Sequence, residues 1–518
     1  MLWRNQLPKG SGPIEESHLL PVDSTLHLPE GLEDGALPLV THFHGAHTES
    51  ASDGQPDAWY TQGWAQRGEW FQKATYRYDF DQRGGSTLWY HDHTIGLTRL
   101  NTYAGLAGMC LLRDLREQLL ILNRVLPPDP YEIELMIQDR WFRSDGQLDL
   151  STSATVPGGV LASMFADFML VNGKPWPVLD VEPRKYRFRL LNGSDSRFLV
   201  LQLDNPDAGF IQVGTELGMC HLAQSAKRIV MGPAERYDIV IDFSAFAGQE
   251  LILRNSGPDG AMRGFRNAAG VVTNNPADNA FGFGPPGPAN PASTGQVMKF
   301  RVSKPLRKDL GGYVRGRVWR DASVEPGTEL GPPLPTLTPT NTRGVITFNG
   351  RDDLGRGMEM QGSLGDGTCF HMDPVTENPA LGSTEIWEIY NTGPVVHPIH
   401  IHLVDFQVLD RQPFTFTSTP KEMTMHNGGT AIGARISDVT KTGTARGPDP
   451  HEVGPKDTVL AYPNEVTRVI ARFKRPGRYV WHCHILHHED HDMMRPYFVG
   501  SQPSAGLCQL PQAGPLPQ

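Results

Sequence analysis

The sequence predicts a multidomain, all-β protein, and three observations support this fold class. The chain has 518 residues, which is too long for one hydrophobic core, so two to four domains are expected. Its 55 glycines and 43 prolines together make up nearly a fifth of the residues, and helical periodicity is rare. Apolar and polar residues alternate at residues 76–80 and 86–90 between turn residues, as in strands.

The order of elements along the chain divides it into three β-rich blocks. The first covers residues 1–115, and a charged connector rich in proline at its end leads into the second, residues 130–305, where strands are predicted at 132–137 and 186–191. A stretch crowded with glycine and proline precedes the third block, residues 335–502. Each block is interpreted as one domain.

Two segments of the third block and its end look irregular. Residues 415–454 are polar and turn-rich, which predicts an inserted loop. Residues 503–518 are rich in proline and glutamine, which predicts a disordered tail.

The charge balance and hydropathy exclude several classes of partner. Acidic residues outnumber basic ones by 57 to 47, and the net charge of −10 offers no attraction to nucleic acid or to anionic membranes. No run of about 18 apolar residues occurs, and residues 1–10 lack the features of an export signal. We therefore expect no membrane partner. The cellular location stays open: a cytoplasmic location is favoured, and an exported form is the alternative if residues precede Met1.

Cysteine is scarce and does not form a disulfide framework. There are 5 cysteines, scattered and odd in number, so one or two bridges at most could form. One of them, Cys483, is distinguished by its neighbours.

Histidine is clustered far beyond chance. With 19 histidines, about 0.7 His-x-His triplets are expected at random. Four are present, namely His42-Phe43-His44, His91-Asp92-His93, His400-Ile401-His402 and His482-Cys483-His484. On a strand, each triplet places two imidazoles on one face, where both can reach a metal. Eight imidazoles exceed the needs of one ion and suit a cluster of about three coppers.

The fourth triplet predicts a second kind of site. On a strand, the thiol of Cys483 must point away from the imidazoles of His482 and His484. Together with His397, His488 and Met493 it forms the two-histidine, one-cysteine set with a weak methionine ligand that is typical of a blue-copper electron-transfer centre. One strand would then serve two sites.

A purely structural role for the histidines is the alternative to metal binding. A single His-x-His triplet more often consists of ordinary surface or core residues than of metal ligands. Four triplets combined with this cysteine and methionine favour metal, and zinc does not fit because its sites use three or four protein ligands.

The motifs resemble those of a known family. His-Phe-His-Gly at 42–45, Trp-Tyr-His-Asp-His at 89–93, His-Pro-Ile-His-Ile-His at 397–402 and His-Cys-His-Ile-Leu-His-His at 482–488 resemble the four copper motifs of multicopper oxidases, in the same order. Residues 52–59, 171–174 and 489–496 are similar to the bacterial spore-coat laccase, phenoxazinone synthase and bilirubin oxidase branch.

The resemblance implies three cupredoxin-like Greek-key β-barrel domains, the first shortened at its N-terminus. It also implies four copper ions. The type 1 copper would be bound by His397, Cys483, His488 and Met493, the type 2 copper by His42 and His400, and the type 3 pair by His44, His91, His93, His402, His482 and His484. Asp53 and Glu489 stand where the family has proton-relay acids, although each could equally orient a ligand histidine.

The resemblance predicts a laccase-like oxidase that takes electrons from phenols, aminophenols or pigments at the exposed edge of His488 and reduces O2 to water. Two alternatives remain open. One is a metallo-oxidase acting on Cu(I) or other reduced ions, with Met423, Met425 and His426 as the supporting residues. The other is a copper-binding protein whose activity is impaired by a shortened first domain.

Overall fold

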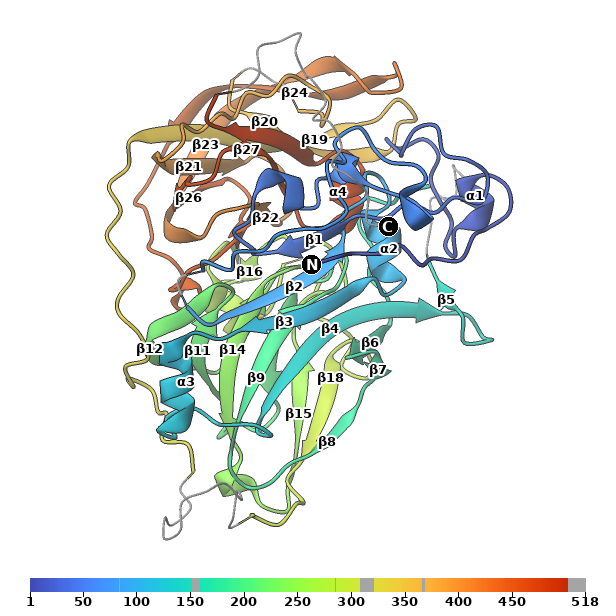
Figure 1. The fold of residues 1–518 in the computed structure, drawn as a ribbon. Coiled ribbons are helices and arrows are strands. Elements are labelled where there is room, and N and C mark those ends of the chain that lie inside the picture. Colours follow the sequence, from blue (N-terminus) through green and yellow to red (C-terminus); the bar gives the residue numbers. More distant parts are fainter. Residues whose placement is uncertain (83, 151–158, 285, 308–320, 366–368, 502–518) are drawn as a thin grey trace.

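The computed structural model describes residues 1–82, 84–150, 159–284, 286–307, 321–365 and 369–501, and it consists mostly of strands (Figure 1). The α helices in these ranges are short: α1 (Ile14–Ser17), α2 (Thr98–Tyr103), α3 (Leu115–Leu122) and α4 (Leu486–Asp490). The all-β prediction is confirmed. In the described part of the chain, no helix combines the length and apolar character needed to cross a membrane.

The N-terminal block contains one antiparallel sheet in the order β1-β2-β3. Its strands are β1 (Thr41–His44), β2 (Ser86–Asp92) and β3 (Ala107–Leu112), and three short 3-10 turns lie between β1 and β2: η1 (Ser50–Ser52), η2 (Pro56–Ala58) and η3 (Gln62–Trp64). The strand predicted at 86–90 is therefore present. The prediction of a strand at residues 76–80 is wrong, because the segment forms only an isolated bridge, from Tyr78 to Thr48.

The middle block forms two sheets that enclose an apolar core. The larger sheet has the order β12-β11-β14-β9-β4-β6-β7, with β5 beside β4: β4 (Glu132–Phe142), β5 (Leu148–Asp149), β6 (Phe168–Val171), β7 (Lys174–Pro175), β9 (Lys185–Asn192), β11 (Phe210–Thr215), β12 (Gly218–Ala226) and β14 (Arg236–Asp242). The smaller has the order β13-β10-β15-β18-β8: β8 (Val178–Asp180), β10 (Leu199–Leu203), β13 (Ile229–Met231), β15 (Glu250–Asn255) and β18 (Gln296–Arg301).

A small hairpin and two turns complete this block: β16 (Phe265–Arg266), β17 (Val272–Thr273), η4 (Ser244–Phe246) and η5 (Pro276–Phe281).

The C-terminal block also forms two sheets. One has the order β20-β19-β21-β26-β23-β24: β19 (Asn341–Arg351), β20 (Gly357–Ser363), β21 (Thr384–Asn391), β23 (Phe406–Thr424), β24 (Thr430–Lys441) and β26 (Glu465–Arg472). The other has the order β25-β22-β27-β28: β22 (His397–Ile401), β25 (Thr458–Ala461), β27 (Gly477–Cys483) and β28 (Met494–Val499). The turn η6 (Pro450–Glu452) precedes β25.

The prediction of a loop at residues 415–454 is wrong over most of that segment. β23 and β24 form a long antiparallel hairpin in which Phe414 is paired with Lys441 and Thr424 with Thr430. The polar residues that suggested a loop occupy the exposed positions of these strands, and residues 442–454 connect the hairpin to β25.

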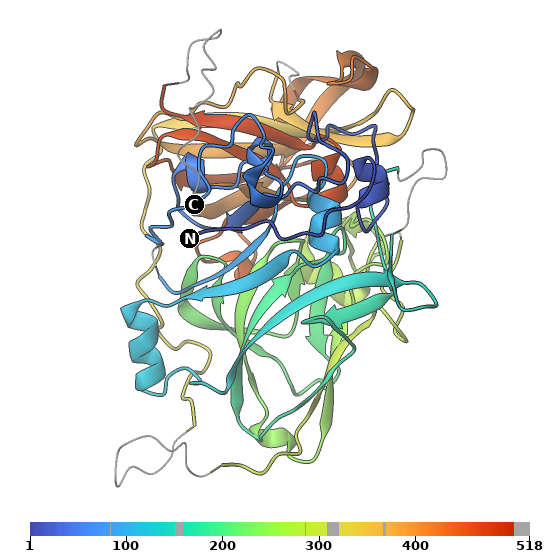
Figure 2. The ribbon, with the colours of Figure 1, turned by 45° about the vertical axis from the view of Figure 1, so that its right-hand side comes forward.

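The N-terminal sheet lies between the other two blocks (Figures 1 and 2). β2 is joined to the middle block by a hydrogen bond from the backbone N–H of Thr87 to the carbonyl of Glu216, 2.9 Å long. On its other side, β1 faces β22 and β27 of the C-terminal block (Figure 1).

The cysteines of the described ranges are all free: Cys110, Cys220, Cys369 and Cys483. The predicted tail and Cys508 lie outside the described residues.

Candidate metal centre

Strand register brings the histidine triplets together in pairs. In the N-terminal sheet, His42 of β1 lies directly opposite His91 of β2. In the C-terminal block, His400 of β22 lies directly opposite His482 of β27. Opposite residues of an antiparallel pair share one face of the sheet, so each pair of strands presents its imidazoles on a single face.

The two histidine-bearing faces meet, and the eight triplet histidines form one cluster. The ring centroids of His44 and His400, from different blocks, are 3.7 Å apart, and those of His42 and His402 are 3.8 Å apart. Every one of the eight side chains is at most 1 % exposed. Three groups of histidines place their ring nitrogens within 4.8 Å of one another: His44, His91 and His484; His93, His402 and His482; and His42, His44 and His400.

The donor atoms of this cluster fit bound metal ions. The Nε2 atoms of His42, His91 and His400 are buried and have no hydrogen-bond partner. Their Nδ1 atoms each donate to a backbone carbonyl, at 2.6, 2.7 and 2.8 Å, which leaves the lone pair on Nε2. Burial lowers the pKa of these imidazoles, to about 3 for His91 and His400, so the rings are neutral ligands at pH 7.

Asp53 contacts two of the cluster histidines. Its carboxylate accepts a hydrogen bond from Nδ1 of His402 at 2.8 Å, and its backbone carbonyl accepts one from Nδ1 of His42 at 2.6 Å. The other carboxylate oxygen has no partner, and burial raises the pKa of this side chain well above its usual value. Asp53 therefore orients ligands and can hold a proton beside them.

Glu489 occupies the matching position on the other side of the cluster. Its carboxylate lies 3.0 Å from Nδ1 of His482 and 3.6 Å from Nδ1 of His93. Burial alone would raise the pKa of Glu489, but the two neighbouring imidazoles outweigh it and lower the pKa. Glu489 is thus an ionised carboxylate between His93 of the N-terminal block and His482 of the C-terminal block.

A third carboxylate, Asp457, was not anticipated from the sequence. One of its oxygens accepts from Nε2 of His44 at 3.0 Å, and its backbone carbonyl accepts from Nδ1 of His400 at 2.8 Å. The guanidinium of Arg236, in the middle block, donates two hydrogen bonds to the same carboxylate, at 2.8 and 2.6 Å. Asp457 stands in no motif, and its partners His44 and Arg236 lie more than 200 positions away in sequence, so no local signal marks it.

The thiol of Cys483 lies on the opposite face of β27, as strand alternation requires. It is opposite Ile399, and its sulfur is 3.5 Å from Nδ1 of His397 and 3.6 Å from Nδ1 of His488. Met493 is fully buried, and its backbone bonds to Cys483 and His488. His397, Cys483 and His488 form a fourth group of donors within 4.8 Å of one another.

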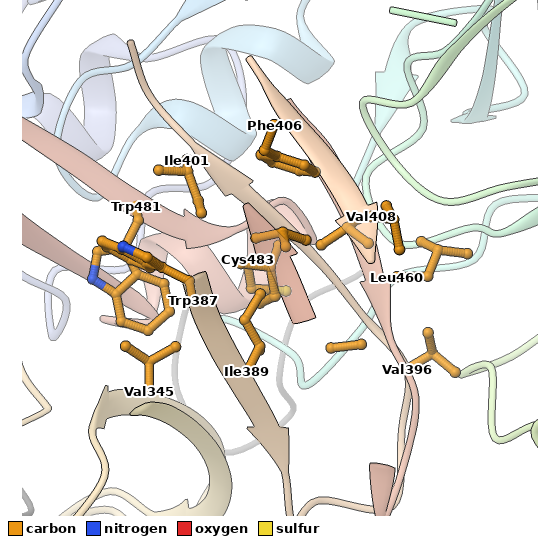
Figure 3. Packing of buried hydrophobic residues seen from close by; sticks show 14 of the residues in the cluster. Val345, Trp387, Ile389, Val396, Ile401, Phe406, Val408, Leu460, Trp481 and Cys483 are labelled. Carbon is orange, nitrogen blue, oxygen red and sulfur yellow. The ribbon is translucent and has the colours of Figure 1, made fainter. Parts of the chain in front are cut away.

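The surroundings of Cys483 are apolar (Figure 3). The side chain lies among Ile389, Val396, Leu460 and their neighbours in a buried apolar cluster that the C-terminal and middle blocks share. Burial raises the pKa of the thiol well above its usual value, so a bound metal must displace a proton. His488 is only 3 % exposed and bonds to the backbone of Ala162, so its edge is more covered than the resemblance implied.

One carboxyl group borders this second site, and the sequence did not indicate it. An oxygen of Glu359 lies 3.8 Å from Nε2 of His397, and burial raises the pKa of Glu359 to about 8. The group is therefore largely uncharged at neutral pH.

Comparisons with known proteins agree with this geometry. Two family models, both described as multicopper oxidase, match residues 36–117 and 338–503. A laccase of Bacillus stratosphericus is 38 % identical over 506 residues, covering 95 % of this chain and 85 % of the relative, and a laccase of Bacillus subtilis (strain 168) is 38 % identical over 503 residues with the same coverage. Among solved structures, the multicopper oxidase McoA from Aquifex aeolicus is similar with a TM-score of 0.63 and 25 % identity, covering 90 % of this chain and 85 % of that one.

Proposed function

The chain belongs to the multicopper oxidase family and is an oxidoreductase that uses O2, and from this premise we propose that its electron donors are small phenolic, aminophenolic or pigment-type aromatic molecules. The family has four copper ions, which, when bound, supply the one-electron chemistry that couples four donor oxidations to the reduction of O2 to water. The convergence of eight buried histidines with the Cys483 strand carries the proposal.

The residue roles we propose follow the four groups of donor atoms. His397, Cys483, His488 and Met493 would hold the type 1 copper, because the thiol of Cys483 and two Nδ1 atoms meet there and Met493 is buried in the same apolar cluster. Two groups of three imidazoles hold the type 3 pair: His44, His91 and His484, and His93, His402 and His482. His42 and His400 remain for the type 2 copper.

Asp53 and Glu489 are proposed to handle the protons. The reduction of one O2 to two waters consumes four protons, and both carboxylates touch cluster histidines. Asp53, whose pKa is raised, holds a proton at its partnerless oxygen, whereas Glu489, whose pKa is lowered, is ionised and relays protons beside His482 and His93. The same contacts orient the rings, so a test of either residue has to separate the two roles.

Electrons reach Cys483 through the protein rather than from a donor in direct contact with it, because the thiol is fully buried. The backbone continues from Cys483 into His482 and His484, whose rings belong to the cluster on the other face of the strand. This strand therefore links donor oxidation to O2 reduction.

The experiment is oxygen uptake by the copper-loaded protein with 2,6-dimethoxyphenol, and with Cu(I) in a parallel cell. Uptake with the phenol and without release of peroxide supports the proposal. Uptake with Cu(I) alone would replace it by a metallo-oxidase, and no uptake with either donor would replace it by an impaired copper-binding protein.

The second candidate function is a metallo-oxidase. The residues that would support it are Met423, Met425 and His426 at the tip of the β23–β24 hairpin. Met423 and Met425 are 9 % and 5 % exposed and pack in an apolar cluster with Cys369, so they do not present thioethers to solvent. His426, between the two strands, is the more accessible group at this tip.

A further inference from the structure

The six-stranded sheet of the C-terminal block closes into a barrel and leaves a cavity at its mouth. Besides its neighbours in sheet order, β19 pairs with β24 through Arg351 and Ile432, and β19, β20, β23 and β24 lie together (Figure 1). A cavity of about 330 Å³ is lined by residues of these four strands and by Gly365. Cavities of this size hold small organic molecules, and the mouths of β-barrels are a frequent place for them.

One wall of this cavity is apolar. Ile346 and Phe348 of β19 are buried, and Ala434 and Ile436 of β24 are partly buried. All four side chains pack in the same apolar cluster inside the barrel. A ligand with an apolar body is favoured against this wall, because covering the wall removes apolar surface from water.

Two basic side chains border the same cavity, and none of its described lining residues is acidic. Lys421 of β23 lies two residues before Met423, so both side chains share the inner face of the strand, where Met423 is buried in the apolar cluster. Arg435 lies at the exposed rim and forms no ion pair with another described residue. The acidic residues next to the lining, Glu422 and Asp438, are exposed. The charge that faces the cavity is therefore positive.

From this lining we propose that the cavity is a binding site for a small aromatic carboxylate. The carboxylate is held by Lys421 and Arg435, because hydrogen bonds between charged partners are stronger than those between neutral ones. The ring lies against Phe348 and Ile436, which offer it aromatic and aliphatic surface. A neutral molecule of the same shape would lose the charged contacts, and a small anion without a ring would lose the apolar ones.

The site is separate from the proposed copper sites. No residue that lines the cavity is among the proposed copper ligands. A molecule held here therefore does not contact a copper ligand, and its binding requires no copper. The carboxylate site and the proposed oxidase function can accordingly fail independently of each other.

The test measures the binding of para-fluorobenzoate to the copper-loaded full chain by fluorine NMR, because this acid has no phenolic hydroxyl group to be oxidised. We expect saturable binding, with an affinity at least about tenfold weaker for the neutral para-fluorobenzamide and for trifluoroacetate, which has no ring. The affinity for para-fluorobenzoate should also fall at least about tenfold in Lys421→Met and in Arg435→Gln, because each substitution removes a charged partner.

A third variant tests the apolar wall without a change of charge. Ala434→Leu should weaken binding to a similar extent, because the larger side chain takes the place of the ring. The control is Lys174→Met, at an exposed lysine of the middle block. Circular dichroism and denaturant unfolding check that every variant is folded.

Absence of saturable binding, or equal affinity of the wild type, Lys421→Met and Ala434→Leu, would overturn the site. Equal affinity for para-fluorobenzoate and trifluoroacetate would also overturn it, because the cavity would then not recognise an aromatic body. Oxygen uptake with 2,6-dimethoxyphenol is followed in the same samples and should be unchanged in the variants. Its absence in the wild type, with binding of para-fluorobenzoate intact, would overturn the proposed function alone.

Discussion

The cluster of eight histidines and the site around Cys483 lie on opposite faces of one strand, yet they are held in different ways. The cluster spans the N-terminal and C-terminal blocks and is bordered by three carboxyl groups, those of Asp53, Glu489 and Asp457, the last of which is bound by Arg236 from the middle block. The Cys483 site lies within the C-terminal block, among apolar side chains (Figure 3). The first site thus depends on how the blocks are assembled, and the second on local strand register.

The strongest way to separate the two sites is to remove the thiolate. Cys483→Ser should abolish the blue absorption and lower phenol oxidation more than about a thousandfold, because the residue belongs to a catalytic unit. The copper of the histidine cluster should remain, since no cluster ligand changes. Copper analysis and absorption spectra check this, and Cys220→Ser, at a buried cysteine of the middle block, is the control. Retained blue colour would contradict the assignment.

The next largest effect on activity is expected at the carboxyl groups beside the cluster histidines. Glu489→Gln should slow O2 reduction about a hundredfold, the usual contribution of a general acid or base, with the blue absorption intact. Stopped-flow reoxidation of the reduced protein measures it. An unchanged turnover would show that Glu489 does not handle protons, and an altered copper content would show that it only orients His482 and His93.

The contact between the middle and C-terminal blocks should be sensitive to charge. Lys456 is buried and bonds to Glu216 at 2.6 Å and to Glu235 at 2.9 Å. Lys456→Met leaves both carboxylates buried without their cation and should cost about 3–5 kcal/mol of stability. The free energy of unfolding is measured by denaturant titration of the copper-free protein. The control is Lys304→Met, at an exposed lysine. A loss of stability under about 1 kcal/mol would mean that the ion pairs of Lys456 do not hold these blocks together.

The smallest effect is expected at the ion pair between Arg236 of the middle block and Asp457 beside the histidine cluster. Asp457→Asn keeps the shape but weakens the ion pair with Arg236 that fixes this residue. Because the backbone carbonyl of Asp457 orients His400, the affinity for the proposed type 2 copper should fall about 10- to 100-fold. Copper retention against a chelator and the type 2 resonance signal measure it. The control is Asp204→Asn, at an exposed aspartate that follows β10 in the middle block. The blue absorption should not change, and an equal loss of type 1 and type 2 copper would remove the contrast between the two sites.

The sequence alone was enough for the fold class and for naming the histidines and the cysteine that the structure brings together, but not for Asp457 or Glu359 beside them. Strand alternation by itself places His397 and Cys483 on one face and His400 and His482 on the other, because a strand has a period of two residues. The same reasoning failed at residues 76–80 and 415–454, where short-range alternation and polarity are shared by strands and loops.

What only the tertiary structure decided is the set of contacts between distant segments. Asp457 reaches His44 across 413 positions, and Arg236 reaches Asp457 across 221. A local pattern encodes which face of a strand a side chain occupies, because that depends on neighbouring residues alone. Which faces meet depends on how whole sheets pack, and no short segment of the chain carries that information.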